Sequence, residues 1–184
     1  ATQVAGLEED GIHSKIFKFL NIPIPEASIL NPACIVDLND GSKPIPIWYK
    51  KNEWIKEREM QFPGSSKFWQ LCNLIHKSNW TFANNNPVLP IKNLWDFKQV
   101  IKALVPMNLA TGILLKSTIF DLLRICGLSN DERLIKFLNL QLKLYSQEDV
   151  HNTAALYGST VLQMCQKPHG LWHLKKSMQV LSNA

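Results

Sequence analysis

Four cysteines carry the most nucleophilic side chains of this chain, and their spacing matches no redox or zinc motif. They are Cys34, Cys72, Cys126 and Cys165, and no two form a C-x-x-C pair. Each lies among apolar neighbours in the sequence. This setting favours buried free thiols in a reducing compartment over disulfides or zinc ligands. We therefore expect no metal site at the cysteines.

The remaining polar clusters do not form a catalytic set. His169 and His173 are four residues apart, a spacing that could ligate a metal on a helix, but a proline precedes them and no third ligand follows. Three adjacent carboxylates, residues 8–10, are typical of a helix start, where they interact with the dipole. The polar run 145–149 favours a helix end running into a loop, with the rim of a pocket as the alternative.

Nucleotide-binding motifs are missing from the sequence. A phosphate site at a strand-to-helix turn needs glycines that let the phosphates approach backbone N–H groups. The chain has eight glycines, and no two are spaced G-x-G. There is also no P-loop and no G-x-S-x-G motif.

Composition indicates one globular domain, residues 1–184, with 46% hydrophobic and 19% charged residues. Six tryptophans and eight phenylalanines suit an interior, or a pocket for an apolar ligand. The net charge of +5 is spread along the chain without a basic arm, so we expect no nucleic-acid partner. No run is long and apolar enough to span a bilayer. The sequon at residues 79–81 is interpreted as chance.

The elements that would position these residues are mostly helices. Residues 12–20 predict an amphipathic helix with Ile12, Ile16, Phe19 and Leu20 on its buried face. Residues 34–49 predict a β-hairpin, because apolar and polar residues alternate on both sides of an Asn-Asp-Gly turn.

Further helices are predicted at about 51–61, after Ser65 or Ser66, after Asn93, over 109–126, behind a capping box at 129–132, and over 153–164. The helix after Asn93 should bury Phe97, Ile101 and Leu104. The fold class is therefore α+β and mostly helical, with one small hairpin and six or seven helices.

Several stretches, in order along nearly the whole chain, resemble the carotenoid desaturases and isomerases. They are ATQVAGLEEDGIH (1–13), QFPGSSKFWQL (61–71), PVLPIKNLWDF (87–97), FLNLQLKLYSQ (137–147) and GLWHLKKSMQVLS (170–182). The sequence looks most like the cyanobacterial C-3',4' desaturase-like branch of this phytoene desaturase-like family. One departure is Lys176, which stands where the family usually has glycine, a residue suited to close approach or positive φ.

This resemblance implies an amine-oxidase-like flavoprotein that binds FAD. Its Rossmann segment would precede residue 1, a second FAD segment would follow residue 184, and this chain would be an internal fragment truncated at both ends. The chain would then supply the substrate-binding part, with a long apolar tunnel. Its partners would be a carotenoid or other polyene, a membrane surface and the remaining FAD-binding segments of the parent chain. The parent protein would be a peripheral protein on the cytoplasmic side of a cyanobacterial thylakoid or plasma membrane.

The resemblance also assigns roles to individual residues, although no catalytic residue follows from it. Those expected near FAD are Ala1, Thr2, Gln3, Gly170, Trp172, Ser177 and Met178. Those expected to contact substrate are Leu142, Tyr145 and Ser146, and those expected to face a membrane are Leu115, Ile119 and Leu122. The flavin would accept a hydride equivalent from the polyene. Two alternatives stay open: cis–trans isomerisation on the same fold, and a free-standing helical lipid-binding or interaction module without catalysis.

Overall fold

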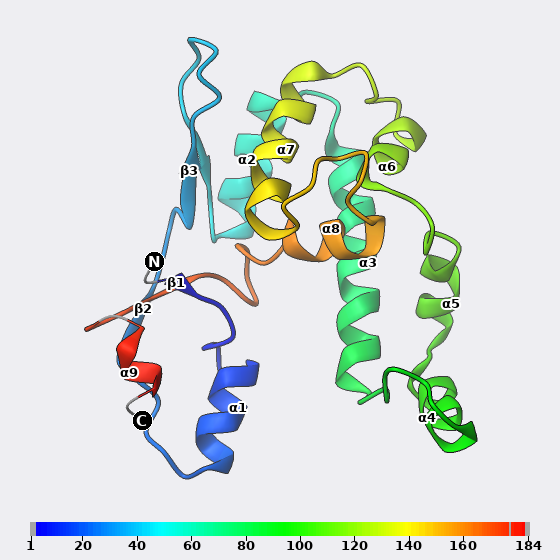
Figure 1. Cartoon of the computed structure of the whole chain (residues 1–184). Helices are drawn as coiled ribbons and strands as arrows, with labels where there is room; N and C mark the ends of the chain where they lie inside the picture. Colours follow the sequence, from blue (N-terminus) through cyan, green and yellow to red (C-terminus); the bar gives the residue numbers. More distant parts are fainter. Residues whose placement is uncertain (1–2, 177, 183–184) are drawn as a thin grey trace. The chain divides into compact units, whose positions relative to one another are not determined.

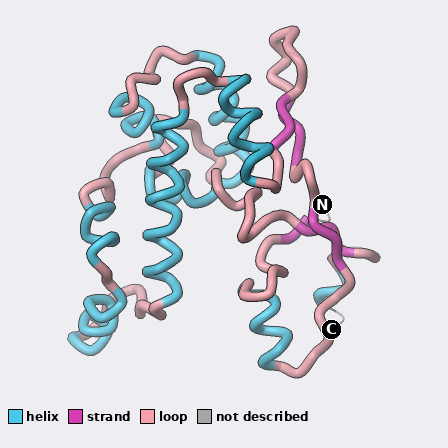
Figure 2. Tube along the Cα trace, turned by 180° about the vertical axis from the view of Figure 1, so that it is seen from behind, coloured by secondary structure: helices cyan, strands magenta, loops and turns pink. Residues whose placement is uncertain are grey.

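The computed structural model describes residues 3–176 and 178–182, and it has the α+β composition predicted from the sequence (Figures 1 and 2). The elements are β1 (Gln3–Val4), α1 (Ile12–Phe19), β2 (Ala27–Ile29), β3 (Cys34–Val36), β4 (Ile45–Ile47), α2 (Lys51–Gln61), α3 (Ser66–Asn84), α4 (Leu94–Ala103), α5 (Pro106–Gly112), α6 (Ile119–Ile125), α7 (Glu132–Tyr145), α8 (Ala155–Val161), β5 (Trp172–Leu174) and α9 (Gln179–Ser182).

The chain divides into two compact units. Unit 1 comprises residues 1–63 and 164–184, and unit 2 comprises residues 64–163. Among the described residues, no helix has the length and apolar character needed to cross a membrane. The substrate-binding role predicted for residues 1–184 as one domain stays a prediction.

A three-stranded antiparallel sheet joins the two chain segments of unit 1. Its strand order is β1-β5-β2, so the strand that comes last in the sequence lies in the middle. Trp172 of β5 pairs with Val4 on one side and with Ile29 on the other. Val4, Leu7 and Leu174 form a small buried cluster beneath it. The sequence analysis missed this sheet entirely.

The hairpin predicted in unit 1 is confirmed. Strands β3 and β4 pair antiparallel, with Cys34 opposite Ile47. Ile45 and Ile47 are buried, and helix α2 packs against β4. In the turn, Asn39 and Gly41 both have positive φ, which their residue types tolerate.

Helix α1 exists as predicted, but its buried face is not the predicted one. Ile12, Ile16, Phe19 and Leu20 are all exposed, with Phe19 at 88%. The buried residues are Ser14 and Phe17. Ser14 is buried because its hydroxyl donates to the backbone oxygen of Leu7 at 2.9 Å, and this bond turns that side of the helix inward.

Unit 2 is built around the long helix α3, which packs against α5, α6 and α8. Asn79 of α3 donates through its amide nitrogen to the Leu156 oxygen and to Thr160 Oγ1 of α8, each at 2.8 Å. A Cβ on Gly158 would come within 2.5 Å of Ile119 Cγ1, so α8 lies very close to α6. Gly158 therefore allows the close packing of α8 against α6.

Helix α7 buries one stripe of residues, which comprises Leu134, Phe137, Leu138, Gln141 and Leu142. The predicted capping box is wrong. Asp131, and not Ser129, is the N-cap, and its carboxylate accepts a hydrogen bond from the Leu134 N–H at 2.9 Å.

The single helix predicted over 109–126 is wrong, because the chain forms two helices there, α5 and α6. Thr118 ends the intervening turn as the N-cap of α6. Its hydroxyl accepts from the Asp121 N–H at 3.2 Å, and the Asp121 carboxylate accepts from the Thr118 N–H at 2.9 Å. This reciprocal pair starts a new helix directly after the polar residues 116–118.

Candidate functional site

The strongest candidate for a site is the place in unit 1 where the beginning and the end of the chain meet. Gln3 of β1 pairs with His173, and Val4 pairs with Trp172 (Figure 1). Two segments separated by most of the sequence, both expected near FAD, are therefore neighbouring strands. Ala1, Thr2 and Ser177, which share that expectation, lie outside the described residues.

Trp172 offers this site a hydrogen-bond donor. Its side chain is partly buried, and its indole nitrogen Nε1 is buried without a hydrogen-bond partner among the described residues. A buried N–H without a partner is costly, so such an atom in a native structure calls for an explanation such as a ligand or water. An acceptor oxygen of a bound group would satisfy it.

Gly170 marks a close approach next to β5. Its φ is +99°, and a Cβ built on it would come within 2.6 Å of Ile29 Cδ1 and 2.9 Å of Tyr49 Cε2. Any side chain here would collide with both neighbours while holding a left-handed backbone. Glycine is therefore required by the space as well as by the conformation.

Lys176 adopts a left-handed backbone conformation, with φ at +79°. Such a φ is uncommon for a residue with a side chain and costs conformational energy. The family glycine expected at this position would hold the same φ without that cost. Met178, two residues on, is 38% exposed.

The acidic loop before α1 contacts the segment before β5 through a side-chain hydrogen bond between Glu8 and His169. His169 Nδ1 lies 3.0 Å from Glu8 Oε1, and both side chains are largely buried. His173 lies on β5, in a different environment. Within the part of the chain that the structure describes, no group of three or more potential ligands could hold a metal ion. The contact with Glu8 gives the His169 side chain a polar partner within unit 1.

The residues expected to bind substrate lie at the C-terminal end of α7. Leu142 is fully buried in the core of unit 2. The Ser146 hydroxyl donates to the Leu142 oxygen at 2.9 Å, and the Tyr145 oxygen accepts from the Tyr157 hydroxyl at 3.1 Å. These contacts match the helix end that the sequence favoured for residues 145–149. Their role in substrate binding stays a prediction.

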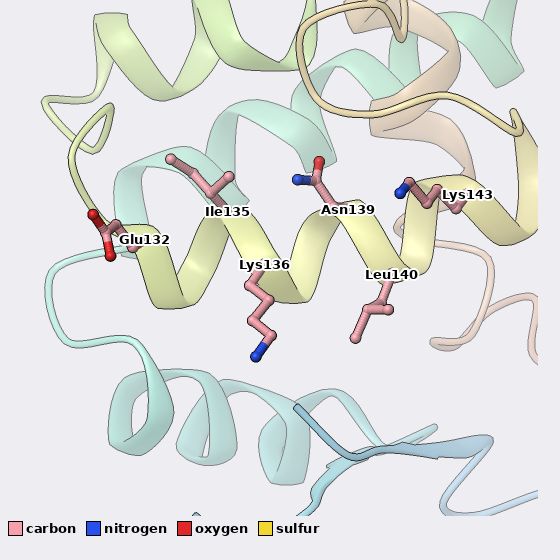
Figure 3. Close-up of a pocket in the computed structure, with 6 residues that line it drawn as sticks. All are labelled: Glu132, Ile135, Lys136, Asn139, Leu140 and Lys143. Atoms are coloured by element: carbon pink, nitrogen blue, oxygen red, sulfur yellow. The ribbon is translucent and has the colours of Figure 1, made fainter. Parts of the chain in front are cut away.

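A hollow of about 340 Å³ lies on a different side of α7 (Figure 3). Its lining comes from one helix only: Glu132, Ile135, Lys136, Asn139, Leu140 and Lys143. The Asn139 side chain already accepts from the Val150 N–H at 2.9 Å. A hollow over one helix face cannot enclose a polyene, so it is not the tunnel that the resemblance implies.

The predicted membrane-facing residues must be corrected. Leu115 is 68% exposed, but Ile119 and Leu122 are completely buried in unit 2. The reason is the break in the predicted helix, which rotates α6 so that its apolar side packs inward against α3 and α8.

Large exposed apolar side chains occur instead on residues 89–115, which include helices α4 and α5. They are Leu89, Ile91, Leu94, Trp95, Phe97, Ile101, Leu109, Ile113 and Leu115. The prediction that Phe97 and Ile101 point inward is therefore wrong, and α4 buries only Asp96 and Ala103. We call residues 89–116 the α4–α5 segment.

Comparisons with models of known protein families, with curated proteins and with solved structures find no match to this chain. The structure thus shows an α+β fold. Because a fold class does not identify a function, the function is inferred from the geometry of the site in unit 1.

Proposed function

We propose that this chain is the substrate-binding part of an FAD-dependent carotenoid desaturase. The observation that supports this most is the pairing of β1 with β5. The resemblance alone assigns Gln3 of β1 and Trp172 of β5 to the flavin, although these two residues are distant in the chain. Their neighbouring positions in one sheet are what a shared cofactor site requires.

Lys176 supports the proposal independently. The resemblance implies glycine at this position, and its φ of +79° is a conformation suited to glycine. The local backbone thus fits the family pattern even though the residue does not.

The residues of unit 1 fit the edge of a flavin site. Trp172 would donate its indole N–H to an acceptor of the cofactor, whereas Gln3, which pairs with His173, is exposed on the opposite face of the sheet. FAD, when bound, supplies the hydride acceptor for desaturation. The protein would position the polyene and exclude water, and phosphate binding would belong to other segments of the parent protein.

The test is expression of the complete reading frame that encodes this chain in a carotenoid-producing bacterium. Desaturation predicts bound flavin and a carotenoid product with one more conjugated double bond. A product of unchanged mass but altered cis–trans geometry would instead establish the isomerase. Stoichiometric FAD on residues 1–184 alone would overturn the assignment as a substrate-binding part.

Trp172→Phe is the sharpest variant, because it keeps an aromatic side chain on β5 and removes only the N–H. We expect lower flavin occupancy and a shifted flavin absorption spectrum in the purified complete protein. Trp95→Phe in unit 2 is the matched control and should leave both unchanged. Equal flavin spectra for Trp172→Phe and the unaltered protein would contradict the role of Trp172.

A second candidate function, association with a membrane surface, is favoured by the α4–α5 segment. Its exposed apolar side chains include Leu94 at 87% and Ile113 at 83%. Four lysines accompany them: Lys92, Lys98, Lys102 and Lys116. The one acidic residue, Asp96, is buried and accepts a hydrogen bond from the Lys92 N–H at 2.9 Å.

This composition suits an interfacial segment on an anionic membrane, where apolar side chains enter the acyl boundary and lysines meet lipid phosphates. The same property would serve a peripheral enzyme on the cytoplasmic face of a membrane or a free-standing lipid-binding module. Vesicle binding therefore tests whether the α4–α5 segment associates with a membrane. The carotenoid assay distinguishes a peripheral enzyme from a free-standing lipid-binding module.

Co-sedimentation with phosphatidylcholine vesicles, with and without phosphatidylglycerol, measures this binding. We expect binding to the anionic vesicles and its loss in the double variant Leu94→Asp/Ile113→Asp. Leu144→Asp is the matched control, because Leu144 is 71% exposed on α7, outside the segment. Equal loss in the control, or no binding by the unaltered protein, would overturn the membrane proposal.

A further inference from the structure

Two cysteines that are far apart in the sequence come together in unit 1. Cys34 is the first residue of β3, and Cys165 follows α8 by a few residues. Both are free thiols. The sequence analysis interpreted all four cysteines separately, because no spacing between them suggested a pair.

Backbone hydrogen bonds position both segments at the end of β4. On one side, the Ala33 N–H donates to the Ile47 oxygen at 2.8 Å, and Cys34 is paired with Ile47. On the other side, the Lys167 N–H donates to the Tyr49 oxygen at 3.1 Å. The Gln166 side chain reaches the Trp48 oxygen at 3.4 Å. The chain around Cys165 therefore runs beside the strand that pairs with Cys34.

The two thiols meet on the buried face of the hairpin. Cys34 alternates with Ile35, which is exposed, and shares its face with Val36, which is buried. Cys165 is only 3% exposed, whereas Cys34 is partly exposed. The Cys165 thiol donates a hydrogen bond to the Cys34 sulfur and lowers the pKa of Cys34, an effect that exceeds the opposing effect of burial.

The other two cysteines of the chain provide the contrast. Cys126 is also partly exposed, but burial raises the pKa of its thiol, and the nearby Lys67 only partly counteracts this. Cys72 is completely buried in α3. Cys34 therefore combines access to solvent with a stabilised thiolate, the two properties that make a cysteine reactive.

We propose that Cys34 and Cys165 are an oxidisable pair that forms a reversible disulfide with hydrogen peroxide as the oxidant. The Cys34 thiol releases its proton, the thiolate attacks one peroxide oxygen and the O–O bond breaks. The leaving hydroxide takes up the released proton, so that a sulfenic acid and one water result. The Cys165 sulfur then attacks the Cys34 sulfur, the S–O bond breaks, and a second water leaves. Two thiols are oxidised to one disulfide while one peroxide is reduced to two waters.

The disulfide would join the two chain segments that make up unit 1. It would close a loop of roughly 130 residues that contains the whole of unit 2, and the lower entropy of the cross-linked unfolded chain would stabilise the oxidised form. This site is independent of the proposed flavin and membrane functions, and it requires neither of them to be correct.

Peptide mapping of the folded chain tests the pair directly. The protein is treated with hydrogen peroxide, free thiols are blocked with iodoacetamide under denaturing conditions, and the digest is analysed by mass spectrometry. We expect a cross-linked peptide pair containing Cys34 and Cys165, lighter by two hydrogens and released by dithiothreitol. The melting temperature should rise after oxidation and return after reduction.

Cys126→Ser is the matched control and should leave the cross-link unchanged, whereas Cys34→Ser should leave Cys165 fully alkylatable. If Cys34→Ser fails to fold, the unaltered protein still decides the question. Recovery of Cys34 as a sulfinic acid while Cys165 remains alkylatable would overturn the proposal. So would a cross-link that involves Cys126 instead of Cys165.

Discussion

The two units of this protein reach their folds by different routes. Unit 2 is one continuous stretch whose helices pack around α3, whereas unit 1 needs a strand from each of three distant places to form one sheet. Unit 2 is determined mainly by apolar burial. The sheet of unit 1 depends on a close approach of neighbouring side chains to the Gly170 backbone and on positive φ values at Gly170 and Lys176. The difference predicts that the two units respond to different kinds of substitution.

The largest effect is expected in unit 2, for Leu138→Ala. Leu138 is completely buried in α7, so the substitution removes apolar contacts and leaves a cavity. The free energy of unfolding should fall by about 3 kcal/mol. Denaturant unfolding followed by circular dichroism measures this loss. Leu144→Ala, on the exposed side of the same helix, should change it by less than about 0.5 kcal/mol, and equal losses would contradict the burial of this stripe.

In unit 1, Gly170→Ala should cost about 2 kcal/mol, because it adds a side chain where there is no space and where φ is positive. Gly41→Ala is the control, since Gly41 has a similar φ of +79° but nothing within 4 Å of the added Cβ. It should cost only about 1 kcal/mol. Equal losses in thermal unfolding would show that the close approach at Gly170 contributes nothing.

Thr118→Ala tests the start of α6 and should cost about 1 kcal/mol, through loss of the N-cap hydrogen bond. Hydrogen bonds from Thr118 lower the pKa of Asp121, with a smaller effect from Arg124. Because this carboxyl has a depressed pKa in the folded state, its contribution is present near neutral pH and is lost as the pH falls through the folded pKa. The stability difference between Thr118→Ala and the unaltered protein should therefore shrink in acid, and a gap that widens would contradict the capping pair.

The smallest effect is a gain. Lys176→Gly should stabilise unit 1 by about 0.5–1 kcal/mol, because glycine holds a φ of +79° without steric cost. Thermal unfolding measures the shift, and Lys175→Gly serves as the control because Lys175 is a neighbouring exposed lysine without positive φ. A loss of stability for Lys176→Gly would argue against a left-handed residue at this position.

Sequence patterns predicted the helices of unit 2 better than the sheet of unit 1, and the reason is physical. The stripe of α7, from Leu134 to Leu142, repeats over several turns, so its period is clear. The strands β1, β2 and β5 are two or three residues long, too short for alternation to be recognised. Their pairing depends on contacts between distant segments, which no local pattern contains.

The errors on exposed faces have a second cause. Phe97 and Ile101 have helical spacing, so an apolar face is predicted correctly, but periodicity does not say whether that face meets a core or solvent. Likewise, the helical spacing of the apolar residues over 109–126 concealed the Thr-x-x-Asp capping signature at 118–121, which divides this segment into two helices. At the candidate site, the resemblance assigned residues of both chain segments of unit 1 to the same cofactor. The proximity of Cys34 and Cys165, in contrast, is visible only in the folded structure.

The central position of β5 has a consequence for synthesis on the ribosome. Strands β1 and β2 leave the exit tunnel early, but neither can pair until residues 172–174 have been translated, because β5 lies between them. The whole of unit 2 emerges in the interval and can fold first. The nascent chain must therefore keep the edges of β1 and β2 from pairing with other chains until residues 172–174 have been translated, and chaperone capture should be strongest during that interval.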